Sequence, residues 1–359
     1  MTDSLLSVRD LRIRFGTDDG TVRAVDGIDF DVRAGETVCL VGESGSGKTV
    51  ACESITRLIP TTSATVEGSI RFDGTDLTTL SESALESYRG GRIGHVFQNP
   101  QDALDPVYTV GAQVVEAIRI HRDVSKGRAR EQAIDLLDRV GIGDAESRFE
   151  DYPHQFSGGM KQRVVVAMAL ACDPDLLIAD EPTTALDVTI QRQVLDLLAD
   201  LQAEREMALL FVTHDLGVVA DIADRVVVMY AGAVMERGDV YDVFEAPAHP
   251  YTRALMACLP GRGEAFETIG GQFPDPTDPP DGCRFHPRCP HAIEECESGS
   301  HPDFRTMEQA DGTATATPGD DADTDSATTT GDDARPHEAA CVLYDDVHTI
   351  PTDVGVADD

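Results

Sequence analysis

The sequence predicts an α/β protein built around a parallel sheet, and two observations lead to that prediction. Between residues 176 and 229, short apolar runs alternate with longer amphipathic ones, in the order strand, helix, strand, helix, strand. Such alternation is typical of a parallel sheet with helices on both faces. The second observation is the segment 42–49, GESGSGKT, which separates an apolar run from a helix-like stretch. The 359 residues leave room for one large domain of this kind and a smaller one.

The elements of the large domain follow from hydrophobic periodicity. The expected strands are 11–15, 22–32, 37–41, 66–72, 93–97, 176–179, 208–212 and 225–229. The expected helices are 48–58, 107–119, 129–140, 157–172, 189–205 and 216–222. Because the pattern is helical from about 100 to 156, we interpret this block as an insertion into the sheet domain.

The last quarter of the chain has a different character. From about residue 261 it becomes rich in Pro and Gly and loses its periodicity. We expect a linker at 261–280, a small cysteine-containing module at 281–305 and a largely disordered acidic low-complexity tract at 308–337. The sequence therefore divides into a domain at 1–260 and an extension at 261–359.

The chain is strongly acidic, with 65 Asp and Glu against 29 Lys and Arg and a formal net charge of −36. Only 7 of these acids fall in the tract 311–335, so the excess is spread over the folded surface. Lysine occurs only at Lys48, Lys126 and Lys161. This composition resembles that of proteins from salt-loving archaea. The same charge argues against nucleic acid as a general partner.

Hydrophobic residues make up 41% of the chain, which is enough for a packed core. No run of about 18 apolar residues occurs, so we expect no membrane-spanning helix. The N-terminus lacks the basic and apolar pattern of a secretion signal, which favours a cytoplasmic protein.

Residues 42–49 match the phosphate-loop pattern G-x-x-x-x-G-K-[ST] in full. A glycine-rich turn between a strand and a helix points successive backbone N–H groups at a phosphate chain, and the helix N-terminus adds partial positive charge. Lys48 would reach the β- and γ-phosphates of a nucleotide, and the Thr49 hydroxyl would bind Mg²⁺. Because the pattern also occurs by chance, assigning a nucleotide site requires support from the motifs that follow it.

Two acids follow the apolar run 176–179, and we expect the end of this strand to lie beside the phosphate loop of the neighbouring strand. Asp180 suits a Mg²⁺ site, and Glu181 suits a general base that polarises the attacking water. Alone, this segment would be interpreted as a strand followed by an acidic loop. The phosphate loop upstream favours the catalytic interpretation.

Three further polar positions come directly after a strand or before a helix. Ser157, followed by two glycines, would leave helix N–H groups free to bind an anion. Gln98 could contact Mg²⁺ or the attacking water, and His214 could contact the γ-phosphate. Taken singly, each is more often an ordinary loop or capping residue, so the argument depends on their order along the chain.

That order resembles the ATP-binding subunit of ATP-binding-cassette (ABC) transporters over about residues 5–260. The resemblance implies a P-loop NTPase core with an antiparallel β subdomain and an inserted helical subdomain, and ATP with Mg²⁺ as cofactors. The implied nucleotide-binding residues are Phe15, which would stack on adenine, Gly42, Glu43, Ser44, Gly45, Ser46, Gly47, Lys48, Thr49, Ser157, Gly158, Gly159, Gln162 and Asp187. The implied catalytic residues are Gln98, Glu181 and His214, and the implied Mg²⁺ ligands are Thr49, Gln98 and Asp180.

Several segments resemble the peptide and nickel uptake subfamily in particular. The signature departs from the common L-S-G-G-Q at Phe156 and Met160 in the manner of that subfamily. The other similar segments are 96–111, 186–191, 249–255 and 283–290. The resemblance implies an ATPase at the cytoplasmic face of the membrane that drives import. Its implied partners are a second ATP-binding subunit, two permeases and an extracellular substrate-binding lipoprotein.

Some alternatives remain open from the sequence. Dipeptides, oligopeptides and nickel are all possible cargoes, and the ATPase pair is formed either with a paralogue or with a second copy. A soluble ABC protein of DNA repair or translation is a competing interpretation. Such proteins usually have a long coiled-coil insert or two cassettes, and this sequence has neither.

The eight cysteines fall into two groups. Four lie singly among apolar neighbours and are expected to be small buried side chains: Cys39, Cys52, Cys172 and Cys258. Four lie in the last quarter, where a cytoplasmic chain more often has a metal site than disulfides: Cys283, Cys289, Cys296 and Cys341. Their spacings are wider than those of structural zinc sites, and the subfamily resemblance implies a [4Fe–4S] cluster. Zinc and four unliganded thiols are the alternatives.

The dispersed acidic charge predicts a salt-dependent fold. In a buffer of about 0.01 M ionic strength, charges repel one another over about 30 Å, whereas molar salt screens them within about 3 Å. We therefore expect partial unfolding or loss of activity in dilute buffer and recovery in molar KCl, measured by thermal denaturation at both salt concentrations. Equal midpoints would contradict a halophilic origin.

Overall fold

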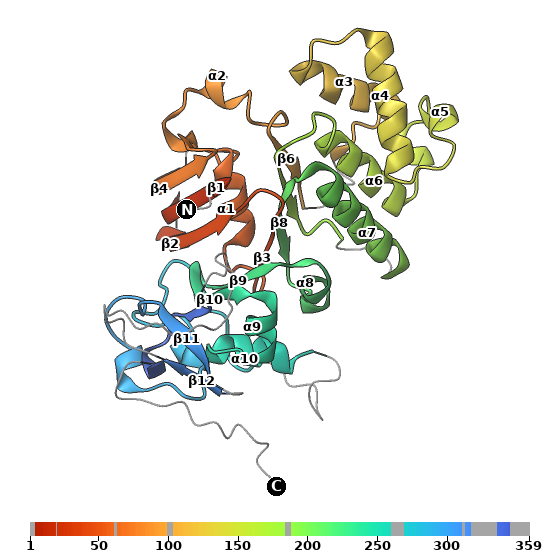
Figure 1. The fold of residues 1–359 in the computed structure, drawn as a ribbon. Coiled ribbons are helices and arrows are strands. Elements are labelled where there is room, and N and C mark those ends of the chain that lie inside the picture. Colours follow the sequence, from red (N-terminus) through yellow and green to blue (C-terminus); the bar gives the residue numbers. More distant parts are fainter. Residues whose placement is uncertain are drawn as a thin grey trace, which may run out of the picture.

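The computed structural model describes residues 4–18, 20–60, 63–98, 103–183, 188–259, 269–310, 313–316 and 336–344. These residues form two sheets with helices packed around them (Figure 1). The smaller sheet is antiparallel, with the order β2-β1-β4-β5, and confirms the expected antiparallel β subdomain. Its strands are β1 (Leu6–Thr17), β2 (Gly20–Val32), β4 (Ala64–Phe72) and β5 (Thr75–Asp76).

The larger sheet contains nine of the described strands, in the order β12-β11-β13-β10-β9-β3-β8-β7-β6. They are β3 (Thr37–Val41), β6 (Ile93–Val96), β7 (Leu176–Asp180), β8 (Ala208–Thr213), β9 (Arg225–Tyr230), β10 (Ala233–Asp239), β11 (Arg305–Ala310), β12 (Thr313–Ala316) and β13 (Glu338–Ala339). The helices are α1 (Lys48–Ile55), α2 (Glu82–Leu85), α3 (Val110–His121), α4 (Lys126–Arg139), α5 (Ala145–Arg148), α6 (Gly158–Ala169), α7 (Val188–Arg205), α8 (Leu216–Ile222), α9 (Val240–Glu245) and α10 (Pro250–Ala257).

A parallel core of five strands, β6-β7-β8-β3-β9, lies at the centre of this sheet. Every residue of β3, β7, β8 and β9 is buried, as expected for parallel strands covered on both faces. One expectation is wrong: we placed the strand of Asp180 beside the phosphate-loop strand, whereas β8 lies between them. Chain order does not reveal this arrangement, because a crossover connection can join strands that are not neighbours.

Beyond β9 the sheet becomes antiparallel, so the expectation of a parallel sheet is correct for only part of it. β9 and β10 form a hairpin through Ala231 and Gly232, which have φ angles of 45° and 82°. Two left-handed residues in succession are the usual geometry of a two-residue hairpin turn. An Ala-Gly pair lacks the common Asn-Gly signal of such turns, and the sequence therefore did not predict β10.

The predicted helical insertion is present as α3, α4 and α5, between β6 and α6 (yellow in Figure 1). The first two helices start where a side chain caps them. Thr109 Oγ1 accepts a hydrogen bond from the N–H of Ala112, and Ser125 Oγ accepts one from that of Arg128. Both helices bury an apolar stripe in the core that they share with α6: Val110, Val114, Ile118, Ala129, Ala133 and Leu137.

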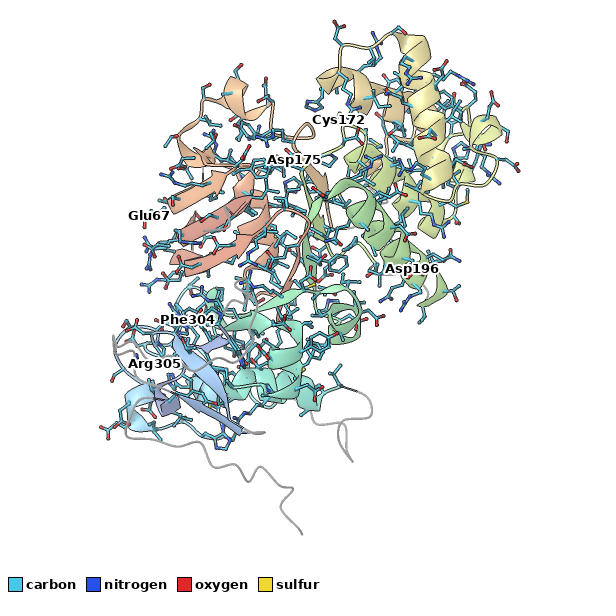
Figure 2. All side chains as sticks on the ribbon, viewed as in Figure 1. Glu67, Cys172, Asp175, Asp196, Phe304 and Arg305 are labelled. Atoms are coloured by element: carbon cyan, nitrogen blue, oxygen red, sulfur yellow. The ribbon has the colours of Figure 1, made fainter. Side chains whose placement is uncertain are left out.

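The C-terminal residues pack against the cassette rather than standing apart from it. β13 pairs with β10 and β11, and Phe285 is fully buried against the rings of Tyr230 and Tyr251. Figure 2 labels Phe304 at this border, where the guanidinium of Arg237 lies 4.3 Å from the centre of its ring. The module is therefore an integral part of the fold.

Two expectations for this region need correction. The expected linker 261–280 includes residues 269–280, which pack on the cassette: the carbonyl of Pro276 accepts a hydrogen bond from the N–H of Arg23 at 2.9 Å. Within the tract 308–337, residues 308–310 and 313–316 form strands instead of being disordered. The contact between Arg23 and Pro276 joins segments far apart in the chain, so local patterns in the sequence did not reveal it. Residues 260–268, 311–312 and 317–335 lie outside the described residues.

Acidic side chains lie on widely separated parts of the surface. Figure 2 labels Glu67 on β4 and Asp196 on α7, at opposite sides of the molecule. This distribution agrees with the sequence, in which the acidic tract holds only a small share of the acids. Among the described residues, no helix combines the length and the apolar character needed to cross a bilayer.

Candidate active site

The segment 42–49 connects β3 to α1, as the sequence predicts. Gly42 and Gly47 have φ angles of 149° and 99°, which side-chain-bearing residues rarely adopt. A Cβ at Gly42 would lie 2.0 Å from the carbonyl oxygen of Met229, and one at Gly47 would lie 2.3 Å from that of Ala24. The loop is therefore held between β9 and β2, with no space for a side chain at either glycine.

The rest of the loop shows how it is fastened and which part faces outward. Ser44 and Gly45 are exposed, whereas Ser46 is fully buried. The carbonyl of Ser46 accepts a hydrogen bond of 3.0 Å from the N–H of Gly232, in the hairpin turn between β9 and β10. The exposed tip is thus free to contact a ligand while its base is anchored to the sheet.

Lys48 is buried at the start of α1. Its Nζ donates hydrogen bonds to the carbonyl oxygens of Gly42 at 2.8 Å and Glu43 at 2.9 Å. Burial lowers the pKa of Lys48 below its ordinary value, and the nearby carboxylates of Glu181 and Asp180 partly offset that effect. A polyphosphate that entered the loop would therefore meet a cation already in place.

Asp180 ends β7 and faces the start of α1. Burial raises the pKa of Asp180, and the nearby Thr49 hydroxyl partly offsets that effect. Its Oδ1 is buried and has no hydrogen-bond partner within the described part of the chain. Mg²⁺ prefers hard oxygen ligands such as carboxylates and hydroxyls. The residues present therefore fit a Mg²⁺ ion, which would satisfy the unpaired oxygen.

Glu181 lies at the centre of the predicted catalytic group. Its Oε2 accepts a hydrogen bond of 3.3 Å from Gln98 Nε2, and its Oε1 lies 3.0 Å from His214 Nδ1. The three residues follow β7, β6 and β8 respectively, and β7 lies between the other two strands. Glu181 also has a φ angle of 46°, a left-handed conformation that costs a non-glycine residue about 1–3 kcal/mol. Three adjacent strand ends thus bring together residues that are separate in the sequence.

The signature segment lies apart from this group. Ser157 Oγ accepts a hydrogen bond from the N–H of Met160 and caps α6, whose first residues are Gly158 and Gly159. Figure 1 shows α6 well separated from α1. The side chain of Gln162 is buried and donates to the carbonyl of Pro182, one residue beyond Glu181. The signature helix is therefore tied to the catalytic loop of its own chain but is distant from its own phosphate loop.

Of the two remaining predicted nucleotide-binding residues, Phe15 and Asp187, the structure describes only Phe15. Phe15 lies on β1, partly buried beside the core that β1 and β2 share. The neighbouring strand β2 contributes Ala24, which contacts the phosphate loop. Asp187 lies outside the described residues. Stacking of Phe15 on adenine therefore stays a prediction.

Two residues that touch the phosphate loop were missed from the sequence. The Tyr251 hydroxyl accepts a hydrogen bond of 2.9 Å from the N–H of Glu43. Arg288 Nη1 lies 3.0 and 3.1 Å from the two carboxylate oxygens of Glu43. Both residues belong to segments that resemble the peptide subfamily, 249–255 and 283–290, which was the only available signal of their importance.

The four C-terminal cysteines come together although Cys341 is distant in sequence. Each of the other three thiols raises the pKa of Cys341, on top of the larger effect of burial. Burial also raises the pKa of Cys283 to about 12. Within the described ranges, however, no three His, Cys, Asp or Glu side chains are close enough to hold a metal ion.

Comparisons with known proteins identify the family of the chain. Residues 25–184 match the model of the ABC transporter family, and residues 235–296 match that of the oligopeptide/dipeptide transporter C-terminal region. The dipeptide transport ATP-binding protein DppD of Escherichia coli is 48% identical over 298 residues, covering 82% of this chain and 91% of that protein. DppD of Bacillus subtilis is also 48% identical, over 82% of this chain and 89% of its own length.

Solved structures of ABC transporter cassettes are also similar to this chain. The dimeric ATP-binding cassette MJ0796, in a post-hydrolysis state with ADP and phosphate, has a TM-score of 0.60 and 27% identity. The match covers 66% of this chain and 98% of that one. CbiO1 of Clostridium perfringens, part of an ABC transporter complex, has a TM-score of 0.58 and 30% identity over 67% and 91% of the two chains. The chain therefore belongs to the ATP-binding subunits of ABC transporters, in the group that carries the oligopeptide/dipeptide transporter C-terminal region.

Proposed function

We propose that this ABC subunit hydrolyses ATP to drive the import of dipeptides and oligopeptides. The observation that carries the peptide assignment is the match of residues 235–296 to the oligopeptide/dipeptide transporter C-terminal region. The relatives in Escherichia coli and Bacillus subtilis, both named as dipeptide transport proteins, favour the same cargo. Nickel import is the second candidate, because the sequence resembles a subfamily that takes up both.

In the proposed mechanism, the phosphate loop and Lys48 bind the β- and γ-phosphates, and Thr49 and Asp180 hold Mg²⁺, which neutralises phosphate charge when bound. Glu181 then acts as the general base that polarises the attacking water. Gln98 and His214 each contact one of its carboxylate oxygens, at 3.3 and 3.0 Å. These two contacts fix the direction in which the base faces.

The distance between the signature and the phosphate loop of the same chain supports a head-to-tail pair. In this arrangement Ser157, Gly158 and Gly159 of one subunit would close over the nucleotide bound to the other, and Gln162 would hold the signature helix to the catalytic loop. Phe15 and Asp187 would complete the nucleotide site. Dimer closure and opening would transmit the hydrolysis cycle to the membrane subunits.

The proposed assembly lies at the cytoplasmic face of the membrane. The cassette, residues 1–260, would dock two permeases through the helical insertion at about 100–156, and an extracellular lipoprotein would deliver the peptide. The second ATP-binding subunit is either a paralogue or another copy of this chain. The extension 261–359 would complete the subunit.

We also propose that Cys283, Cys289, Cys296 and Cys341 hold a [4Fe–4S] cluster, with zinc as the alternative. In a cluster each thiolate bonds a different iron, so four thiols can be grouped without meeting at one point. Burial raises the pKa of the thiols of Cys283 and Cys341, and bound iron would supply the positive charge that keeps them deprotonated. We assign the proposed cluster no role in ATP hydrolysis.

Peptide import is tested by deleting the gene for this chain and measuring uptake of a radiolabelled dipeptide and of ⁶³Ni²⁺ in the same strain. We expect loss of dipeptide uptake, restored by the wild-type gene but not by Glu181→Gln. Loss of nickel uptake alone would assign the chain to nickel import.

The role of Glu181 predicts a specific effect of Glu181→Gln. The amide keeps the shape of the side chain but cannot accept a proton, so ATP hydrolysis should fall by about 10²–10⁴ while ATP binding survives. Lys48→Ala should instead abolish nucleotide binding. Single-turnover hydrolysis and equilibrium binding on the purified proteins separate the two effects. Wild-type turnover by Glu181→Gln would disprove the assignment of the base.

The cysteine proposal predicts brown protein after anaerobic purification, with broad absorbance near about 400 nm and iron in elemental analysis. Cys283→Ser should lose the colour, whereas Cys172→Ser, which changes a buried cysteine outside the group, should keep it. Colourless protein with zinc would support the alternative metal, and metal-free protein would leave four unliganded thiols.

A further inference from the structure

Arg288 connects the C-terminal module to the phosphate loop through a buried set of hydrogen bonds. Its side chain is only 4% exposed, at the end of the short helix His286–Arg288. Nε and Nη2 donate to the carbonyl oxygens of Gly270 at 2.8 Å and Ile269 at 3.0 Å. Nη1 donates to the Tyr230 hydroxyl at 3.0 Å and to both carboxylate oxygens of Glu43. All three nitrogens are therefore engaged, and the guanidinium is fixed in position.

The residue that Arg288 contacts is the second residue of the phosphate loop. The backbone of Glu43 is already part of the site, because its carbonyl accepts Lys48 Nζ and its N–H donates to Tyr251. Its carboxylate would therefore lie beside the phosphates of a bound nucleotide. An unpaired carboxylate there would repel them, and the repulsion would be strong because the surroundings are only partly solvated.

The segment around Arg288 makes further contacts on the same side of the loop. A Cβ placed on Gly45 would lie 3.6 Å from the ring of Phe273, at ordinary contact distance. The carbonyl of Pro276 accepts a hydrogen bond from the N–H of Arg23, next to Ala24, whose own carbonyl faces the loop. Residues 269–288 thus lie across the outer side of the phosphate loop, and Arg288 supplies the positive charge that contacts it.

We propose that Arg288 is a positioning residue of the ATP site, which neutralises Glu43 and holds the phosphate loop ready for nucleotide. The C-terminal module thereby sets the nucleotide affinity of its own subunit. This inference rests on the assignment of 42–49 as the ATP-binding loop, but it concerns how that loop is held. The proposed effect of Arg288 depends on the negative charge of Glu43. Removing that charge should therefore restore nucleotide binding in an Arg288 variant, whereas it would not do so if Arg288 only stabilised the fold.

The test compares Arg288→Gln with the double variant Glu43→Gln/Arg288→Gln, using full-length protein and calorimetric titration with Mg·ADP. Arg288→Gln leaves the carboxylate unpaired, so the Kd should rise about tenfold, the size expected for losing charge-assisted hydrogen bonds. Adding Glu43→Gln removes the repulsion and should restore the Kd to within about threefold of wild type. Arg288→Lys keeps the positive charge but lacks the planar guanidinium, so its Kd should lie between those of wild type and Arg288→Gln.

Arg284→Gln is the matched control. Arg284 is also a buried arginine of the module, but it pairs with Asp26 on β2 and does not touch the loop. Its loss should lower the unfolding midpoint while the Kd stays within about threefold of wild type.

Three results would overturn the proposal. They are an unchanged Kd in Arg288→Gln, a double variant that binds Mg·ADP no better than Arg288→Gln, and a loss of affinity in Arg284→Gln as large as that in Arg288→Gln. In each case wild-type protein would still bind Mg·ADP, so the ATP-binding role would stand. Failure of wild-type protein to bind would instead contradict the proposed function.

Discussion

The whole site depends on two close backbone contacts that hold the phosphate loop. Gly42 faces the carbonyl of Met229 on β9, and Gly47 faces that of Ala24 on β2, each too closely for any side chain. The first contact belongs to the parallel core and the second to the antiparallel sheet. The loop that we propose binds the phosphates is therefore fixed jointly by two sheets. Tyr251 on α10 and Arg288 in the C-terminal module both contact Glu43 of the same loop.

The hydrolytic side of the site follows from strand order. Because β7 lies between β6 and β8, the residues that follow the three strands meet at one edge, and Gln98 and His214 both contact Glu181. β8 also separates β7 from β3, so the catalytic group and the phosphate loop follow strands that are not neighbours. The carboxylates of Glu181 and Asp180 nevertheless lie near enough to Lys48 to raise its pKa, against the larger lowering effect of burial. In the proposed mechanism, the γ-phosphate would lie between the ammonium of Lys48 and the carboxylate of Glu181, the proposed base.

Local patterns were enough to predict much of this site. The phosphate loop, Asp180 and Glu181 each follow a short apolar run, so their place at strand ends could be read directly from the sequence. What could not be read is long-range pairing. Arg288 and Glu43 are 245 positions apart, and Cys341 joins its group across the acidic tract. The order of β3, β8 and β7 and the pairing of β13 with β10 depend on the same kind of contact, which leaves no periodicity in the sequence.

We infer that the contacts with β2, β9 and Arg288 already shape the phosphate loop for nucleotide. The decisive experiment is a crystal structure of the full chain with Mg²⁺ and a non-hydrolysable ATP analogue. We expect phosphates within residues 42–49, left-handed backbone retained at Gly42 and Gly47, Mg²⁺ at Thr49 and Asp180, and the Arg288–Glu43 pair intact. Phosphates bound elsewhere, or a loop that leaves its contacts with Met229 and Ala24 to receive them, would contradict it.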